Sequence, residues 1–164
     1  MSIHVYTGDG KGKSTCAAGL AARFAATGKK VAFFQFLKCD ASGECESLKT
    51  VVDFYQTEGV FGFLFQMDEA EKQQVKIKTE RLWQKAKRTP CEMLVLDEIL
   101  GAVSEGLIAE GDVLQFIKNV ASEVVLTGRN ASKSILDAAD YVTEMKKIKH
   151  PFDKGENARE GIEF

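Results

Sequence analysis

The sequence predicts an α/β protein, with a mostly parallel β-sheet and flanking helices in the P-loop NTPase (RecA-like) architecture. Short β-branched or aromatic runs alternate with longer helical segments, which is typical of parallel strands joined by crossover helices. Most of the short runs lack polar alternation, as expected of strands that are covered on both faces. A glycine- and lysine-rich segment also lies between the first strand and the first helix, where phosphate-binding loops occur.

The individual elements follow in chain order from local composition. Six short runs rich in β-branched and aromatic residues are predicted strands, at residues 3–6, 31–37, 51–55, 93–97, 123–127 and 141–144. Four longer segments with alanine-rich or helically spaced apolar residues are predicted helices, at residues 13–27, 69–89, 110–119 and 132–139. Gly28 and Pro90 directly follow the first two helices and mark their ends.

Length and composition exclude several classes of protein. With 164 residues, 45% of them hydrophobic, the chain is expected to form a single domain, residues 1–164, with an irregular tail from about residue 150. The net charge of -2 disfavours nonspecific nucleic-acid binding. No segment has the pattern of a secretory leader or a membrane span, so we expect a cytoplasmic protein with no membrane contact. The four cysteines lack the paired spacing of a zinc site.

The strongest functional signal is the segment between the first strand and the first helix. Its predicted nucleotide-binding residues are Thr7, Gly8, Asp9, Gly10, Lys11, Gly12, Lys13, Ser14 and Thr15. Glycines let backbone N–H groups surround a phosphate, and the following helix adds its positive dipole end. Lys13 supplies a point charge, and Ser14 offers a hydroxyl to Mg²⁺. The usual spacing would place the first glycine at position 7, so Gly8 predicts an atypical phosphate loop.

Two other strand ends carry side chains suited to a nucleotide site. Four apolar residues lead into Asp97 and Glu98 at the carboxyl end of a buried strand, where open α/β sheets bind ligands. We expect Asp97 to hold Mg²⁺ through water and Glu98 to contact metal, water or substrate. Arg129 follows the strand at 123–127, and its guanidinium suits a terminal phosphate. The alternatives are a surface acidic turn and a solvated arginine in a helix-capping turn.

Together these segments resemble the ATP:corrinoid adenosyltransferase family of cobalamin biosynthesis and salvage. The matching stretches run nearly from end to end, at residues 5–15, 35–38, 96–98, 127–129, 149–153 and 161–164. The shortened phosphate loop is a trait of that family. Without the other stretches, the phosphate loop would indicate only a nucleotide-binding protein.

The resemblance implies a particular reaction. The Co(I) of cobalamin or a corrinoid precursor attacks the ribose C5′ of ATP, which releases triphosphate and forms the 5′-deoxyadenosyl corrinoid. Lys13, Glu98 and Arg129 would be the catalytic residues of this transferase. Mg²⁺ or Mn²⁺ would be held by Ser14, Asp97 and Glu98, and it would help to stabilise the leaving triphosphate.

The resemblance also implies a corrinoid contact through aromatic side chains. In the family such side chains displace the lower axial ligand of the cobalt, and the counterparts here are Phe63 and Phe65. The family often has tryptophan where Phe65 stands. Phenylalanine keeps the apolar wedge but lacks the indole donor. Phenylalanines that fill a core are the alternative interpretation.

The implied partners are ATP, the corrinoid, an electron-donating reductase such as a flavoprotein, and a second copy of the chain in a homodimer. Two other functions compete with this one. The first is a nucleotide-binding regulatory protein without turnover, and the second is a small P-loop ATPase or nucleotide kinase. A kinase needs clustered cations over a mobile γ-phosphate. The arginines do not form such a cluster in the sequence, since they stand at positions 23, 81, 88, 129 and 159.

Overall fold

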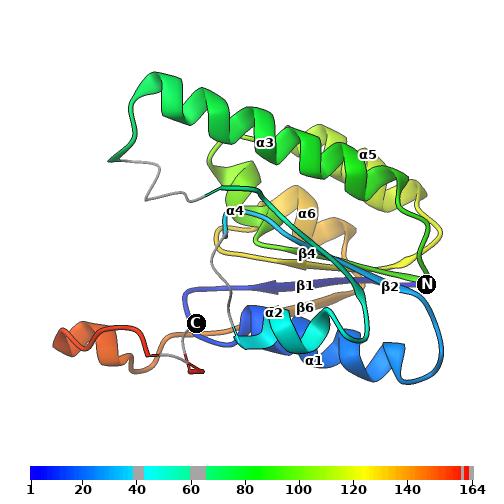
Figure 1. Cartoon of the computed structure of the whole chain (residues 1–164), viewed down its shortest axis with the longest axis horizontal. Coiled ribbons are helices and arrows are strands. Elements are labelled where there is room, and N and C mark those ends of the chain that lie inside the picture. The colour runs from blue at the N-terminus through cyan, green and yellow to red at the C-terminus, as the bar shows by residue number, and fades with distance from the viewer. Residues whose placement is uncertain (39–42, 60–65, 160, 163–164) are drawn as a thin grey trace.

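The computed structural model describes residues 1–38, 43–59, 66–159 and 161–162. Within these residues, six strands form one sheet in the order β3-β2-β4-β5-β1-β6, and every neighbouring pair is parallel (Figure 1). The strands are β1 (Ile3–Thr7), β2 (Val31–Gln35), β3 (Asp53–Gln56), β4 (Met93–Asp97), β5 (Glu123–Thr127) and β6 (Tyr141–Glu144). The predicted α/β class with a parallel sheet is confirmed.

Helices cover both faces of the sheet (Figure 1). One face packs against α1 (Lys13–Ala25) and α2 (Gly43–Leu48), and the other against α3 (Glu69–Arg88), α4 (Ile99–Ser104), α5 (Glu110–Asn119) and α6 (Lys133–Ala138). Side chains alternate between two cores: Phe33 and Val95 belong to the α1 side, whereas Phe34 and Leu94 belong to the α3 side. This alternation explains why the strands read as continuous apolar runs.

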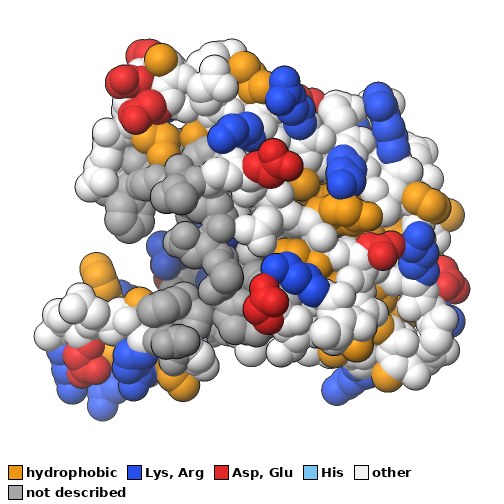
Figure 2. Space-filling model, in the orientation of Figure 1, with side chains coloured by type: hydrophobic (Ala, Val, Ile, Leu, Met, Phe, Trp, Pro, Cys, Tyr) orange, Lys and Arg blue, Asp and Glu red, His pale blue; other side chains and the backbone are white. Residues whose placement is uncertain are grey.

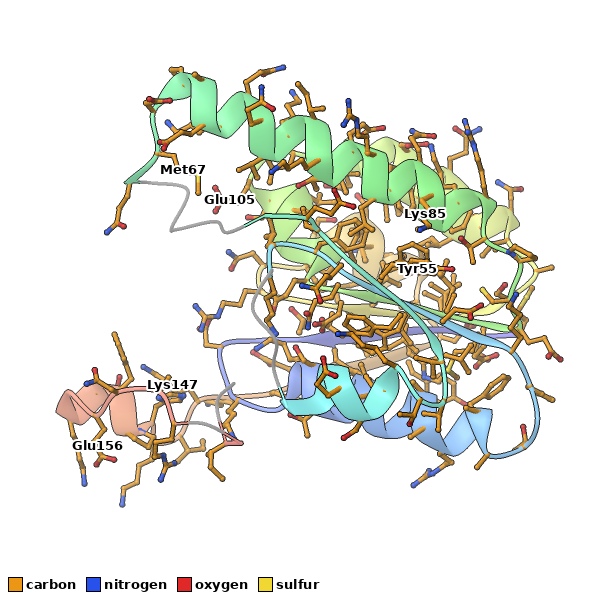
Figure 3. The ribbon with its side chains drawn as sticks, viewed as in Figure 1. Tyr55, Met67, Lys85, Glu105, Lys147 and Glu156 are labelled. Atoms are coloured by element: carbon orange, nitrogen blue, oxygen red, sulfur yellow. The ribbon has the colours of Figure 1, made fainter. Side chains whose placement is uncertain are left out.

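The edge strand β3 is covered by α3. In Figure 3 the Lys85 side chain of α3 lies over Tyr55 of β3, with Nζ 3.9 Å from the ring centroid. The Tyr55 ring in turn stacks on Phe34 at a centroid distance of 4.7 Å. In the same core, Trp83 of α3 is fully buried and its ring packs edge-on against Phe116. The inner side of α3 therefore packs into the hydrophobic core, and its basic residues lie on its outer side.

The structure differs from the sequence prediction at several element ends. The second strand ends at Gln35 rather than at position 37, because Leu37 has a left-handed backbone with φ 59°. The third strand begins at Asp53, two residues later than predicted. Two short helices, α2 and α4, were not predicted. Glu98, which precedes α4, is itself left-handed with φ 61° and makes no side-chain capping hydrogen bond, so α4 lacks the usual signal of a helix start.

The C-terminal tail follows β6 and contains one 3₁₀ turn, η2 (Pro151–Lys154). Residues 151–159 are all exposed, and Figure 1 shows this segment projecting beside the main body. In Figure 2 the chain after β6 forms a lobe with several Lys and Arg side chains on its outer side. Among the described residues, no helix combines the length and apolar character that a membrane crossing needs.

The strand order decides which chain segments meet at the functional edge. All six strands are parallel, so their carboxyl ends lie at one edge of the sheet. Strand β5 lies between β1, which leads into the glycine-rich loop, and β4, which ends in Asp97. The residues after β5, including Arg129, are thereby placed between the loop and the carboxylates. This arrangement agrees with the expectation from sequence that these segments share one edge.

Candidate active site

The glycine-rich loop between β1 and α1 rests against the backbone that follows β6. The Gly10 N–H donates to the Met145 carbonyl at 2.6 Å, and the Met145 N–H donates to the Thr7 carbonyl at 2.8 Å. A Cβ atom at Gly8 or at Gly10 would lie 2.6 Å from the Met145 carbonyl oxygen. Both positions therefore need glycine. This close approach gives a physical reason for the unusual position of Gly8 in the loop.

Lys13 folds back into the loop from the first turn of α1. The side chain is buried, and its Nζ donates to the carbonyl oxygens of Gly8 and Gly10, each at 2.7 Å. Burial lowers the pKa of the Lys13 ammonium, and the nearby Glu98 carboxylate opposes this shift. The ammonium thus lies inside the curve of the loop, with partners that a phosphate oxygen could replace. This is the placement expected of a phosphate-binding lysine.

Asp97 ends β4 and is fully buried. Its Oδ1 accepts a hydrogen bond from Thr127 Oγ1 at 2.6 Å, and its Oδ2 accepts one from Gln35 Nε2 at 3.2 Å. These donors come from the ends of β5 and β2, the two strands that flank β4. Asp97 is therefore held rigidly by both neighbouring strands.

Glu98 follows directly and faces the cavity. Its backbone N–H donates to Thr127 Oγ1 at 2.9 Å, so one threonine hydroxyl orients both acidic residues. Burial raises the pKa of the Glu98 carboxyl, and the Asp97 carboxylate raises it further. The cations of Lys38, Lys13 and Arg129 oppose these effects. Two adjacent carboxyl groups thus share a site in which a cation would be stabilised.

A cavity of about 250 Å³ brings most of these groups together. Its lining residues are Asp9, Gly10, Lys11, Gly12, Lys13, Ser14, Thr15, Lys38, Glu98, Arg129, His150 and Ile162. Seven of the nine predicted loop residues are in this lining, together with Glu98 and Arg129. Thr7 and Gly8 contribute backbone carbonyls behind the loop, and Asp97 lies behind the cavity wall. Phe63 and Phe65, the predicted corrinoid contacts, lie outside the described residues.

The donor set fits a metal ion that is shared with a nucleotide. The described residues include no group of three or more His, Cys, Asp or Glu side chains able to hold a metal. Mg²⁺ commonly binds through one or two carboxylates, with phosphates and water as its other ligands. Ser14 and Glu98 line the cavity, and Lys38 Nζ lies 3.0 Å from Ser14 Oγ and 3.7 Å from Asp97 Oδ2, so these oxygens are the candidate ligands for such an ion.

Sequence reasoning missed three features of the site. Thr127 and Lys38 were recognised only as parts of matching stretches, with no role assigned, yet Thr127 orients the acidic pair and Lys38 Nζ donates to Ser14 Oγ at 3.0 Å. Residues of the tail, His150 and Ile162, also line the cavity. His150 Nδ1 also accepts the Phe152 N–H at 3.2 Å and so caps η2.

Replacing Glu98 by glutamine is expected to raise the free energy of unfolding at pH 7 by about 1 kcal/mol. The folded chain binds the Glu98 proton more tightly than the unfolded chain, because the folded pKa is raised. This contribution to stability is complete below the ordinary glutamate pKa and is lost as the pH rises through the folded value. Glutamine stays neutral and avoids that loss.

Urea unfolding at pH 7 and pH 4 measures this effect, with Glu58→Gln as the control because Glu58 is an exposed glutamate. The gain from Glu98→Gln should shrink toward pH 4, and Glu58→Gln should change stability little at either pH. A Glu98→Gln variant that is less stable at pH 7, or equally stabilised at both pH values, would contradict the buried-carboxylate explanation.

Comparison with known proteins shows similarity along the whole chain. Residues 1–164 match the sequence model of the family described as "ATP:corrinoid adenosyltransferase BtuR/CobO/CobP". The chain is 38% identical to a corrinoid adenosyltransferase of a Sinorhizobium species, over 99% of this chain and 79% of that protein. It is 34% identical to the corrinoid adenosyltransferases of Escherichia coli K12 and Salmonella typhimurium LT2, in each case over 99% of this chain and 85% of the relative.

Proposed function

Because the chain belongs to the ATP:corrinoid adenosyltransferase family, we propose that it transfers the 5′-deoxyadenosyl group of ATP to the Co(I) of a corrinoid and releases triphosphate. The supporting structural observation is the cavity itself. It gathers Lys13, Lys38 and Arg129 at the start of α1, and such a set of cations suits a polyphosphate. In this reaction the polyphosphate is the leaving group, so the cations would lie where negative charge develops.

The bond changes require little acid–base chemistry from the protein. The cobalt supplies the electron pair of the new Co–C bond, the C5′–O bond breaks, and its electrons leave with the triphosphate. No proton has to move in that step. Lys13 and Arg129 would stabilise the departing oxygens, and the rigid loop would fix the direction of C5′. Ser14, Asp97 and Glu98 would hold Mg²⁺ or Mn²⁺, which supplies further positive charge to the triphosphate.

The loop geometry supports an atypical way of holding the nucleotide. Gly10 directs its N–H to the Met145 carbonyl rather than into the loop, so this donor is already used. The Lys13 ammonium instead lies among the loop carbonyls. A phosphate here would depend on Lys13 and on the remaining N–H groups at the start of α1. This agrees with the atypical phosphate loop that the position of Gly8 predicts.

The corrinoid side of the site is assigned to Phe63 and Phe65 by their resemblance to the family pattern. Cobalamin or a corrinoid precursor is the proposed acceptor, and an electron-donating reductase such as a flavoprotein is the proposed source of Co(I). We further propose a cytoplasmic homodimer. The resemblance to the family supports these partners, and the cavity adds no support for them.

Replacing Phe65 by alanine is expected to slow the reaction of cob(II)alamin with a reductant roughly tenfold more than the reaction of preformed cob(I)alamin. The aromatic wedge is needed to remove the lower axial ligand before reduction, and preformed Co(I) bypasses that step. Rates from the two cobalamin states measure the difference, and Phe65→Trp should retain both rates. Equal losses in the two reactions would reject the ligand-displacement role.

One assay separates the proposed reaction from the alternatives. The protein is incubated with ATP, Mg²⁺ and a chemically reduced corrinoid, while the visible spectrum and the phosphate products are followed. A light-sensitive alkylcobalt together with triphosphate is the expected result. ADP as the product would indicate a phosphoryl-transfer enzyme, and tight ATP binding without turnover would indicate a regulatory protein. Either of these outcomes would contradict the proposal.

A further inference from the structure

Lys38 brings its ammonium between two of the proposed metal ligands. Its Nζ donates a hydrogen bond to Ser14 Oγ at 3.0 Å and lies 3.7 Å from Asp97 Oδ2. Ser14 belongs to the first turn of α1, and Asp97 ends β4, so one cation connects the phosphate loop with the buried strand end. The Lys38 side chain is 41% exposed and lines the cavity. It can therefore interact with a ligand in that cavity as well.

The backbone before Lys38 is held in an unfavourable conformation. Leu37 has φ 59°, a left-handed value that a residue with a branched side chain rarely adopts. The neighbouring residues maintain it: the Phe36 N–H donates to the Asp97 carbonyl at 2.9 Å, and the Leu37 side chain packs against the core. Such strain persists where the surroundings impose it, and it is concentrated at functional sites. Here its effect is to turn the chain so that Lys38 reaches Ser14.

Asp97 also needs a nearby positive charge. It is fully buried, and its hydrogen-bond donors Thr127 and Gln35 are neutral. Burying a carboxylate whose partners are all neutral costs folding free energy, so a cation beside it stabilises the folded chain. Of the described residues, Lys38 is the one that forms an ion pair with this carboxylate. The ammonium thus supplies at Asp97 the kind of charge that a divalent ion would supply.

We propose that Lys38 is a nucleotide-binding residue that competes with the divalent cation for Ser14 and Asp97 and binds the triphosphate in its place when the metal is scarce. This inference rests on the proposed function, because it assumes that the cavity holds the triphosphate of ATP. It has a specific consequence. Lys38 should matter much more for binding ATP without metal than for binding it with metal, because the metal takes over the same two oxygens.

The test is isothermal titration calorimetry of ATP binding to the full chain in EDTA and in saturating Mg²⁺. Lys38→Met removes the charge but keeps an unbranched side chain of similar length. Its affinity for ATP should fall roughly ten- to a hundredfold in EDTA, the range for a hydrogen bond to a charged group. In Mg²⁺ the loss should be less than about threefold by the same arithmetic. By linkage, Mg²⁺ should then bind the variant's ATP complex more tightly than it binds the unchanged complex.

One control variant makes the comparison specific. Lys118→Met removes the same charge from the last turn of α5, at the other end of the sheet, and should leave both affinities unchanged. Equal losses for Lys38→Met in EDTA and in Mg²⁺ would overturn the inference, because they would show a general electrostatic effect. Unchanged binding in EDTA would overturn it as well. Failure of the unchanged chain to bind ATP in either solution would instead overturn the proposed function, and the inference with it.

Discussion

Replacing Lys13 by alanine should lower the rate constant of adenosyl transfer by roughly 10²–10³-fold, the usual effect of removing one preorganised donor to a developing negative charge. The Lys13 ammonium is buried inside the phosphate loop, 2.7 Å from the carbonyl oxygens of Gly8 and Gly10. The variant would lack a buried cation that we propose stabilises the leaving triphosphate. Single-turnover rates with preformed cob(I)alamin and saturating MgATP measure this directly, because reduction is then not limiting.

Lys118→Ala is the matched control for Lys13→Ala, since it removes an equal charge from the far end of the sheet. Its rate should be unchanged. Thermal unfolding of both variants shows whether the fold is retained. Activity of the folded Lys13→Ala variant close to that of the unchanged chain would remove the phosphate loop from the mechanism.

Replacing Asp97 by asparagine should lower the same rate constant by roughly 10²-fold and raise the Mg²⁺ concentration needed for half-maximal rate. Asparagine has nearly the same shape and can still accept the hydrogen bond from Thr127 Oγ1. It removes the negative charge that would hold the metal. The loss should therefore appear mainly as weaker Mg²⁺ binding, measured as rate against Mg²⁺ concentration at fixed ATP.

Asp112→Asn is a suitable control, because Asp112 also accepts two side-chain hydrogen bonds but lies on α5, away from the cavity. Its partners are Trp83 Nε1 at 2.6 Å and Lys87 Nζ at 2.8 Å. This variant should lose stability without a change in Mg²⁺ dependence. An Asp97→Asn variant with normal rate and normal Mg²⁺ dependence would contradict the assignment of Asp97 as a metal ligand.

The parts of the fold predicted best are those with strong local patterns. Strands β4 and β5 have the predicted ends, because each is a run of buried apolar residues with a sharp change in polarity after it. Asp97 ends β4 and Arg129 lies shortly after β5, so the sequence also predicted the correct edge of the sheet for these residues. The start of α1 follows directly from the glycines and Lys13 in the same way.

The features that sequence did not predict depend on contacts between distant segments. The need for glycine at position 8 arises from the Met145 carbonyl, which belongs to the chain after β6. The role of Thr127 requires β5 to lie beside β4, which local composition does not specify. The approach of Lys38 to Ser14 depends on the left-handed backbone of Leu37, and leucine gives no local signal for such a conformation.

Isotope tracing distinguishes attack on C5′ of ATP, with the triphosphate held at the loop, from cleavage at phosphorus. ATP carrying ¹⁸O in the C5′–O–P bridge is reacted with preformed cob(I)alamin, and the products are analysed by mass spectrometry. Cleavage of the C5′–O bond predicts that the label is recovered in intact triphosphate, with the nucleoside carbon bound to cobalt. Recovery of the label in adenosine, AMP or ADP would show cleavage at phosphorus and would contradict the proposed reaction.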